Sequence, residues 1–140
     1  MKSLRSIALG LGLLLATAAA NAQGVAVRAN IPFDFVAGNQ VFPAGEYTLQ
    51  PAQGDQTALA IRSSDGKSMA NVITFGCWNP DLSKDSTLVF HHVGSRYLLS
   101  KVQIQGYIEG QQLLPNRAEA EVASNQKAGR VVIFAELVNR

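Results

Sequence analysis

Residues 87–104 are the part of this chain that most constrains its fold. Their sequence, TLVFHHVGSRYLLSKVQI, consists of two apolar-rich runs joined by Gly94-Ser95. A glycine at the first position of a two-residue loop suits a type II′ turn, which connects neighbouring antiparallel strands. The stretch therefore predicts a β-hairpin, and this hairpin carries both histidines of the protein, His91 and His92.

This turn also predicts which residues lie opposite each other. The expected pairs are His92–Tyr97, Phe90–Leu99 and Leu88–Lys101 on one face, and His91–Leu98 and Val89–Ser100 on the other. Because both faces are partly apolar, the hairpin is expected to lie centrally in a sandwich or beneath a helix.

A second hairpin is predicted around Asp65-Gly66, a pair favoured in type I′ turns because both central residues need a positive φ. The flanking runs are 58–62 and 67–75. The register that follows places Leu59 opposite Val72, Ile61 opposite Ala70 and Arg62 opposite Met69. The bulky aliphatic residues then share one face.

The remaining strands are predicted from alternating apolar residues or from continuous apolar runs. They cover 25–31, an extended path through Phe33 and Phe35 to a turn at Gly38-Asn39, a return arm from Val41, 46–50 with Tyr47 and Leu49 inward, and 130–138. Loops are expected at 51–56, 76–86 and 106–112, and one short helix at about 114–123. The fold class is therefore mostly β: an antiparallel β-sandwich or a flattened barrel of about seven to nine strands.

Residues 1–22 have the features of a signal peptide. Lys2 and Arg5 precede an apolar run over 7–20 that ends in Ala20-Asn21-Ala22, a small-x-small cleavage pattern. The run is shorter than the roughly 20 residues that span a bilayer. We expect the leader to be removed and residues 23–140 to form one exported β-rich domain, periplasmic or extracellular, without a membrane span.

Removing the leader changes the charge balance. The whole chain has a formal net charge of +2, which the loss of Lys2 and Arg5 cancels. Nucleic-acid binding requires several convergent cations, so a neutral chain without a Lys/Arg cluster argues against that class of partner.

Several motifs together resemble those of small, uncharacterised secreted proteins that are abundant in acidobacterial genomes. The motifs are ANIPFDF at 29–35, GN at 38–39, FPAGEY at 42–47, IRSSDG at 61–66, LVFH at 88–91, RYLLS at 96–100 and LPNRAE at 114–119. The resemblance implies a single exported β-rich unit. It assigns no activity and no catalytic or binding residue.

The histidines and the single cysteine were considered as reactive groups. Adjacent strand residues point to opposite faces, so His91 and His92 are poorly placed to bind one metal, and His92 is expected to stack on Tyr97. Cys77 is expected to be a buried thiol or to form an intermolecular disulfide in a dimer. A nucleophilic site combining Cys77 with either histidine lacks a supporting local motif.

Trp78 is the best candidate for ligand contact, with Tyr97 and His92 as contributors. An exposed aromatic ring on a β-domain can bind a glycan, but packing of Trp78 in the core or at its rim is the favoured expectation, because tryptophan is usually mostly buried. The leading hypothesis is a non-catalytic exported β-domain, a binding or structural module that needs no cofactor and contacts an envelope protein or a glycan. Carbohydrate or small-ligand binding around Trp78 is the alternative, and a hydrolase or metal protein using His91, His92 or Cys77 is a third hypothesis.

Overall fold

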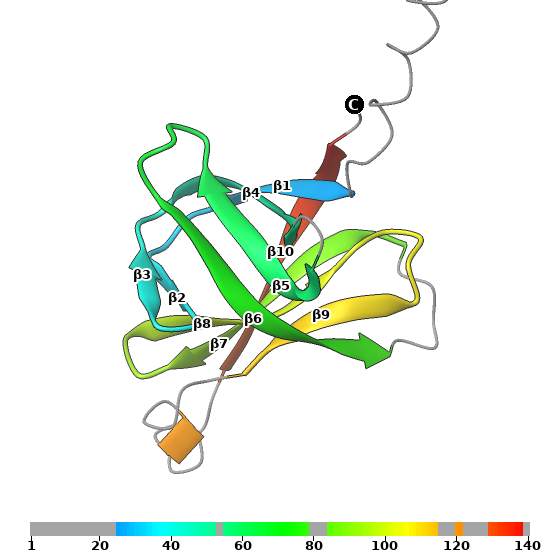
Figure 1. Cartoon of the computed structure of the whole chain (residues 1–140). Coiled ribbons are helices and arrows are strands. Elements are labelled where there is room, and N and C mark those ends of the chain that lie inside the picture. Colours follow the sequence, from blue (N-terminus) through cyan, green and yellow to red (C-terminus); the bar gives the residue numbers. More distant parts are fainter. Residues whose placement is uncertain (1–24, 53–54, 79–83, 115–119, 122–128, 139–140) are drawn as a thin grey trace, which may run out of the picture.

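One ten-stranded sheet makes up nearly all of the described structure. The computed structural model describes residues 25–52, 55–78, 84–114, 120–121 and 129–138. The strands are β1 (Ala26–Ile31), β2 (Phe35–Ala37), β3 (Gln40–Phe42), β4 (Gly45–Ala52), β5 (Asp55–Ser63), β6 (Met69–Trp78), β7 (Ser86–Val93), β8 (Arg96–Gln103), β9 (Glu109–Leu113) and β10 (Gly129–Val138). Figure 1 shows these strands curling around a common interior.

Eight of these strands close into an antiparallel barrel. Their order is β8, β7, β10, β1, β4, β5, β6 and β9, and β9 pairs back with β8 through Lys101–Gln112 and Val102–Gln111. The short β2–β3 hairpin is added outside this ring, with β2 parallel to β8. The predicted mostly β fold is confirmed, and the flattened barrel is the form the chain adopts.

Aromatic rings fill much of the barrel interior. The rings of Phe35 and Tyr47 meet edge to face with centroids 5.1 Å apart, and Phe35 and Phe42 stack at the same distance. The Tyr47 hydroxyl donates a 2.5 Å hydrogen bond to the carbonyl oxygen of Pro43. Burial is the main cause that raises the pKa of Tyr47 above its ordinary value. Tyr47 and Leu49 both face inward, as predicted.

The predicted register of the β5–β6 hairpin is confirmed, but its turn type is not. Leu59 lies opposite Val72, Ile61 opposite Ala70 and Arg62 opposite Met69. No described non-glycine residue has a positive φ, so Asp65 does not adopt the type I′ conformation. Instead the Asp65 carboxylate accepts hydrogen bonds from Ser63 Oγ at 2.6 Å and from the backbone N–H of Lys67 at 2.9 Å. These bonds favour a wider loop with only Gly66 left-handed (φ +75°).

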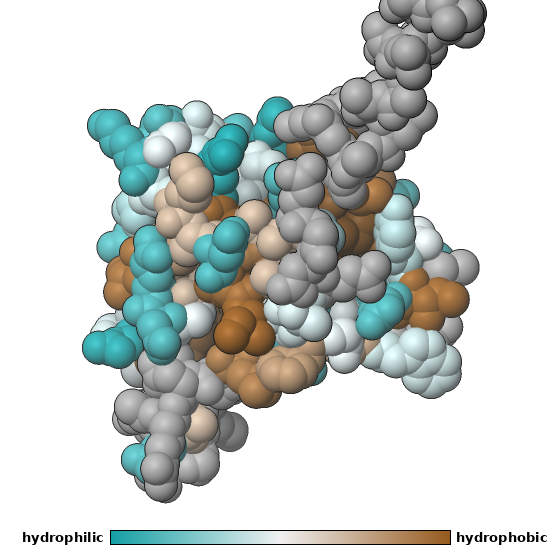
Figure 2. Space-filling view, in the orientation of Figure 1, coloured by the Kyte–Doolittle hydropathy of each residue, from teal (hydrophilic) through white to brown (hydrophobic). Residues whose placement is uncertain are grey.

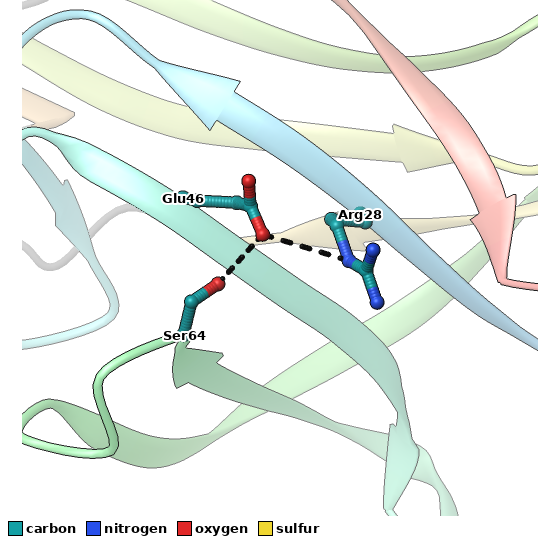
Figure 3. Close-up of polar contacts among 3 residues, drawn as sticks. All are labelled: Arg28, Glu46 and Ser64. Atoms are coloured by element: carbon teal, nitrogen blue, oxygen red, sulfur yellow. Dashed lines mark hydrogen bonds and ion pairs between the residues drawn. The ribbon is translucent and has the colours of Figure 1, made fainter.

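The same turn is attached to the neighbouring strand through Glu46. The backbone N–H of Ser64 donates to the Glu46 carbonyl at 2.9 Å, and Ser64 Oγ donates to Glu46 Oε1 at 2.8 Å. Arg28 Nε lies 3.6 Å from the same oxygen (Figure 3). Both ionic side chains are about half exposed, so this ion pair contributes little stability and Glu46 serves as a surface link.

The β7–β8 hairpin is central, as predicted, because β7 lies between β8 and β10. The pairs His92–Tyr97, Phe90–Leu99 and His91–Leu98 are confirmed, and Gly94 has φ +62°. A β-bulge between Val89 and Phe90 then shifts the register, so the predicted pairs Leu88–Lys101 and Val89–Ser100 are wrong. Leu88 instead lies opposite Val102, and both are buried in the core. The bulge keeps apolar residues of both strands inside the barrel.

The three loops predicted from the sequence are shorter in the structure, because polar residues there take part in backbone pairing between strands. β4 and β5 extend into 51–56, β6 continues through Trp78 into 76–86, and β9 lies within 106–112 and beyond. Of the predicted helix, Leu114 is not helical and Ala120 and Glu121 are helical, and the other residues lie outside the described ones. The predicted leader also lies outside them.

The strand predicted at 130–138 is confirmed as β10. β10 pairs with β1 on one side and with β7 on the other, so the first and last strands of the barrel are neighbours. In the part of the chain that the structure describes, no helix has the length and apolarity needed to cross a membrane.

Gly38 is required both by its backbone and by its surroundings. Its φ is +61°, and an added Cβ would lie 3.2 Å from Val72 Cγ1. Gly66 has a similar φ of +75° but no atom within 4 Å of such a Cβ. We predict that Gly66→Ala lowers the free energy of unfolding by about 1 kcal/mol and Gly38→Ala by about 2 kcal/mol. Urea denaturation of both variants measures the difference, and equal losses would show that the Val72 contact has no cost.

Asp65 should make folding stability depend on pH. The hydrogen bond from Ser63 first, and that from the Lys67 N–H second, hold the pKa of Asp65 below its ordinary value. The stabilisation is therefore present above the unfolded-state pKa and is lost as the pH falls through the folded-state pKa. We predict that Asp65→Asn loses less stability than the wild type between neutral and acidic pH. Ser63→Ala should reduce this dependence partly, and identical urea midpoints across the pH range would contradict the assignment.

Candidate functional site

An aromatic stack lies near the β7–β8 turn. The rings of His92 and Tyr97 are nearly parallel, with centroids 4.3 Å apart, as the sequence predicted. Phe33 stacks on Tyr97 at 3.9 Å and meets Phe90 edge to face at 5.0 Å. Because two rings stack on Tyr97 at van der Waals distance, they occupy its two opposite faces. Only the edge and hydroxyl of Tyr97 therefore remain for a ligand.

The two histidines point to opposite faces of β7. His91 is exposed and lies opposite Leu98 and Arg130, whereas His92 is half-buried in the stack. Among the described residues, no group of three or more His, Cys, Asp or Glu side chains could hold a metal ion. The tight pairing of His92 with Tyr97 gives it a packing role.

Trp78 is the most exposed of the large apolar residues, with 78% of its surface accessible. It is the last residue of β6, and its exposure shows that the favoured expectation of packing in the core or at its rim is wrong. Strand alternation places it on the same row as Val72 and Thr74, whose side chains face the barrel interior. Trp78 is the last residue of this row and lies at the end of the barrel, beyond the buried core residues.

Glu109 lies directly opposite Trp78 in the β6–β9 ladder. Gly76 precedes Trp78 on the same row, and a Cβ added to Gly76 would overlap the Glu109 carboxylate. The carboxylate therefore lies over the bare backbone of Gly76, beside the indole. A negative charge and an aromatic face are thus presented together at this end of the barrel.

Two polar atoms continue this row toward the interior. Thr74 Oγ1 and Gln111 Oε1 are buried, and within the described residues neither has a hydrogen-bond partner. Gln111 lies opposite Gly76, and Thr74 lies opposite Leu113, so both belong to the inward face of β6 and β9. Buried polar groups ordinarily find partners, so these two oxygens are unusual within the inward face of β6 and β9.

Cys77 does not join this row. It lies on the outer face of β6, where its sulfur sits 3.2 Å from the position that a Cβ on Gly110 would take. The thiol is half-buried, so the predicted burial is only partial, and an intermolecular disulfide remains a prediction. Strand alternation separates the thiol from the side chain of Trp78.

The predicted ligand residues lie in two separate regions of the barrel. Trp78 lies opposite Glu109, and β9 runs beside the end of β8, with Gln111 opposite Val102. Tyr97 lies near the start of β8, so about 20 Å of strand separates the two aromatics at roughly 3.3 Å per residue. A site combining Cys77 with His91 or His92 is likewise not formed. Tyr97 and His92 belong together, and Trp78 belongs with Glu109.

An apolar groove of about 600 Å³ lies between the β2–β3 turn and β6. It is lined on its outer side by Ile73, Phe75 and Leu114, all of them exposed. Figure 2 shows hydrophobic surface in the middle of the face over which β6 runs. Among the residues that the structure describes, those lining the groove are apolar or carry amides and none is charged, so the groove offers shape and apolar contact without acid–base groups.

Sequence reasoning missed Glu109, Gln111 and Phe33. The first two lie in a stretch interpreted as a polar connection, although their spacing of two residues before Leu113 is the signal of a strand face. Phe33 lies far from Tyr97 in the sequence, and no local pattern predicts their contact. Compared with protein-family models, curated proteins and solved structures, the chain has no match.

The stack should contribute measurable stability. Replacing Tyr97 with leucine removes two ring contacts while keeping an apolar side chain, and we predict a loss of about 1–3 kcal/mol in the free energy of unfolding. Tyr107→Leu is the matched control, because Tyr107 is about half exposed, and its loss should stay below about 0.5 kcal/mol. Equal effects of the two substitutions in chemical denaturation would show that the stack adds nothing.

Proposed function

We propose that this protein is an exported, non-catalytic binding module of the cell envelope or extracellular space, with its ligand contact centred on Trp78. The observation that carries the binding part is the exposed indole beside the Glu109 carboxylate at the end of the barrel. Support for export comes from the leader-like residues 1–22. Trp78 and Glu109 pair with each other at the end of the β6–β9 ladder, beyond the residues that pair with β5 and β8.

The ligand class that fits this end is a polyhydroxylated one, a carbohydrate. An indole ring packs against the C–H face of a sugar, and a neighbouring carboxylate accepts hydrogen bonds from vicinal hydroxyls. The side-chain oxygens of Gln111 and Thr74 lie further along the same row but are buried, so the exposed polar contact is the Glu109 carboxylate. Exposed aromatic surface and acceptors are thus combined without a nucleophile in the row.

The envelope protein considered from the sequence fits the apolar groove less specifically, since the described residues that line the groove include amide side chains but no charged group. A hydrolase or metal protein using His91, His92 or Cys77 is disfavoured by their separation on different faces and at different ends of β8. Carbohydrate binding at the barrel end is therefore the function we propose.

The test uses the single tryptophan of the chain as its own reporter. Titrating the protein without residues 1–22 with a panel of soluble polysaccharides should change Trp78 fluorescence saturably. By calorimetry, Trp78→Ala should weaken binding at least about tenfold, and Glu109→Gln by about threefold to tenfold. Phe134→Ala is the control, because Phe134 is similarly exposed but lies on β10, away from β6 and β9.

Two results would contradict the proposal. One is the absence of saturable fluorescence change with every polysaccharide of the panel. The other is binding that survives Trp78→Ala unchanged, in a variant whose circular dichroism and melting temperature match the wild type.

A further inference from the structure

A small depression of about 260 Å³ lies on the outside of the barrel, far from Trp78. The segment leading into β2 provides Asp34, and the beginning of β8 provides Arg96 and Tyr97. Val36 and Val41 of the β2–β3 hairpin form an aliphatic part of its wall. The depression thus combines one carboxylate, one guanidinium and an aliphatic surface.

Two parts of this wall are held in place without a ligand. Tyr97 is fixed between the rings of Phe33 and His92. Asp34 is oriented by the backbone N–H of Ala44, which donates to its Oδ1 at 2.9 Å. A wall ordered in advance loses little conformational entropy when a ligand binds.

The two charges line the same depression but do not pair. Within the part of the chain that the structure describes, the ion pair formed is Arg28–Glu46, and Arg96 has no carboxylate partner. Among the described residues, the hydrogen bond to Asp34 is accepted by Oδ1, which leaves its second oxygen available. Opposite charges held apart across a small depression complement a molecule that carries both charges itself.

We infer that this depression binds a small zwitterion, a free aliphatic α-amino acid, with its carboxylate on Arg96 and its ammonium on Asp34. A guanidinium binds a carboxylate through two parallel hydrogen bonds, and an ammonium donates to a carboxylate oxygen. The aliphatic side chain packs against Val36 and Val41. The volume equals that of roughly nine water molecules, which suits a molecule of about that many heavy atoms.

This site is independent of the proposed carbohydrate contact at the barrel end. Both charged groups are exposed, so their attraction to a ligand is screened, and we expect a dissociation constant in the millimolar range. NMR titration of the ¹⁵N-labelled protein detects such binding residue by residue.

The probe is L-leucine at up to about 50 mM, with N-acetyl-L-leucine amide as the matched ligand that lacks both charges. L-leucine should shift the backbone signals of Asp34, Val36 and Arg96 saturably, and the neutral analogue should not. Arg96→Gln should raise the dissociation constant at least about tenfold. Asp34→Asn should do the same while its amide oxygen still accepts the Ala44 N–H. Arg62→Gln, which removes an exposed arginine on β5, should leave the constant unchanged.

Three results would overturn the inference: no saturable shift with L-leucine, equal shifts with the neutral analogue, or an unchanged dissociation constant in Arg96→Gln. Shifts confined to Glu109 and Gln111 would place the amino acid at the barrel end and would also overturn it. Because the carbohydrate test reads Trp78, failure of either proposal leaves the other intact.

Discussion

The pairing of β8 with β9 is the contact on which the closed barrel depends. Only Lys101–Gln112 and Val102–Gln111 join these strands, yet they connect the two ends of the eight-strand order. Without them β9 would be an edge strand with unpaired backbone groups on one side. The first half of β8 pairs on the same side with β2 at Leu98, so one edge of this strand is divided between two partners. This edge of β8 is therefore paired partly with β9 and partly with the β2–β3 hairpin.

This division explains why the β2–β3 hairpin packs as it does. β9 pairs with β6 over Thr74–Trp78, whereas the first half of β6 pairs with β5 alone. The turn of the β2–β3 hairpin approaches this half, with Gly38 against the Val72 side chain. The barrel wall is thus completed there by side-chain packing and not by backbone hydrogen bonds. The apolar groove along β6 is the remaining space between these two elements.

Features of the fold that depend on residues close in the sequence were predicted, whereas those that depend on residues far apart in the sequence were not. The β5–β6 register was predicted correctly although the turn type was wrong, because alternation of Leu59 and Ile61 fixes which residues face inward whatever the loop. The β7–β8 register was correct only up to the bulge after Val89. The position of a bulge depends on the packing of the whole barrel, and no local sequence pattern predicts it here.

The candidate site was predicted in part for the same reason. The His92–Tyr97 stack was predicted correctly from the hairpin register, whereas Trp78, a candidate ligand contact, was expected to be packed and is exposed. Glu109 was missed because the residues of β9 are mostly polar, and it meets Trp78 only through long-range pairing of β9 with β6. The stacking of Phe33 on Tyr97 likewise joins residues distant in the sequence. Local patterns predict hairpins, and closure of the barrel decides which hairpins meet.

Gly76 links the fold to the proposed site most directly. Glycine inside a strand costs stability relative to alanine because it loses more conformational freedom on folding. Gly76 does not have a positive φ, so its backbone conformation does not require glycine. The Glu109 carboxylate occupies the space that a side chain at residue 76 would fill, but it is the flexible end of an exposed side chain and can move aside. The absence of a side chain at residue 76 thus leaves room for the Glu109 carboxylate over β6, on the row that ends at Trp78.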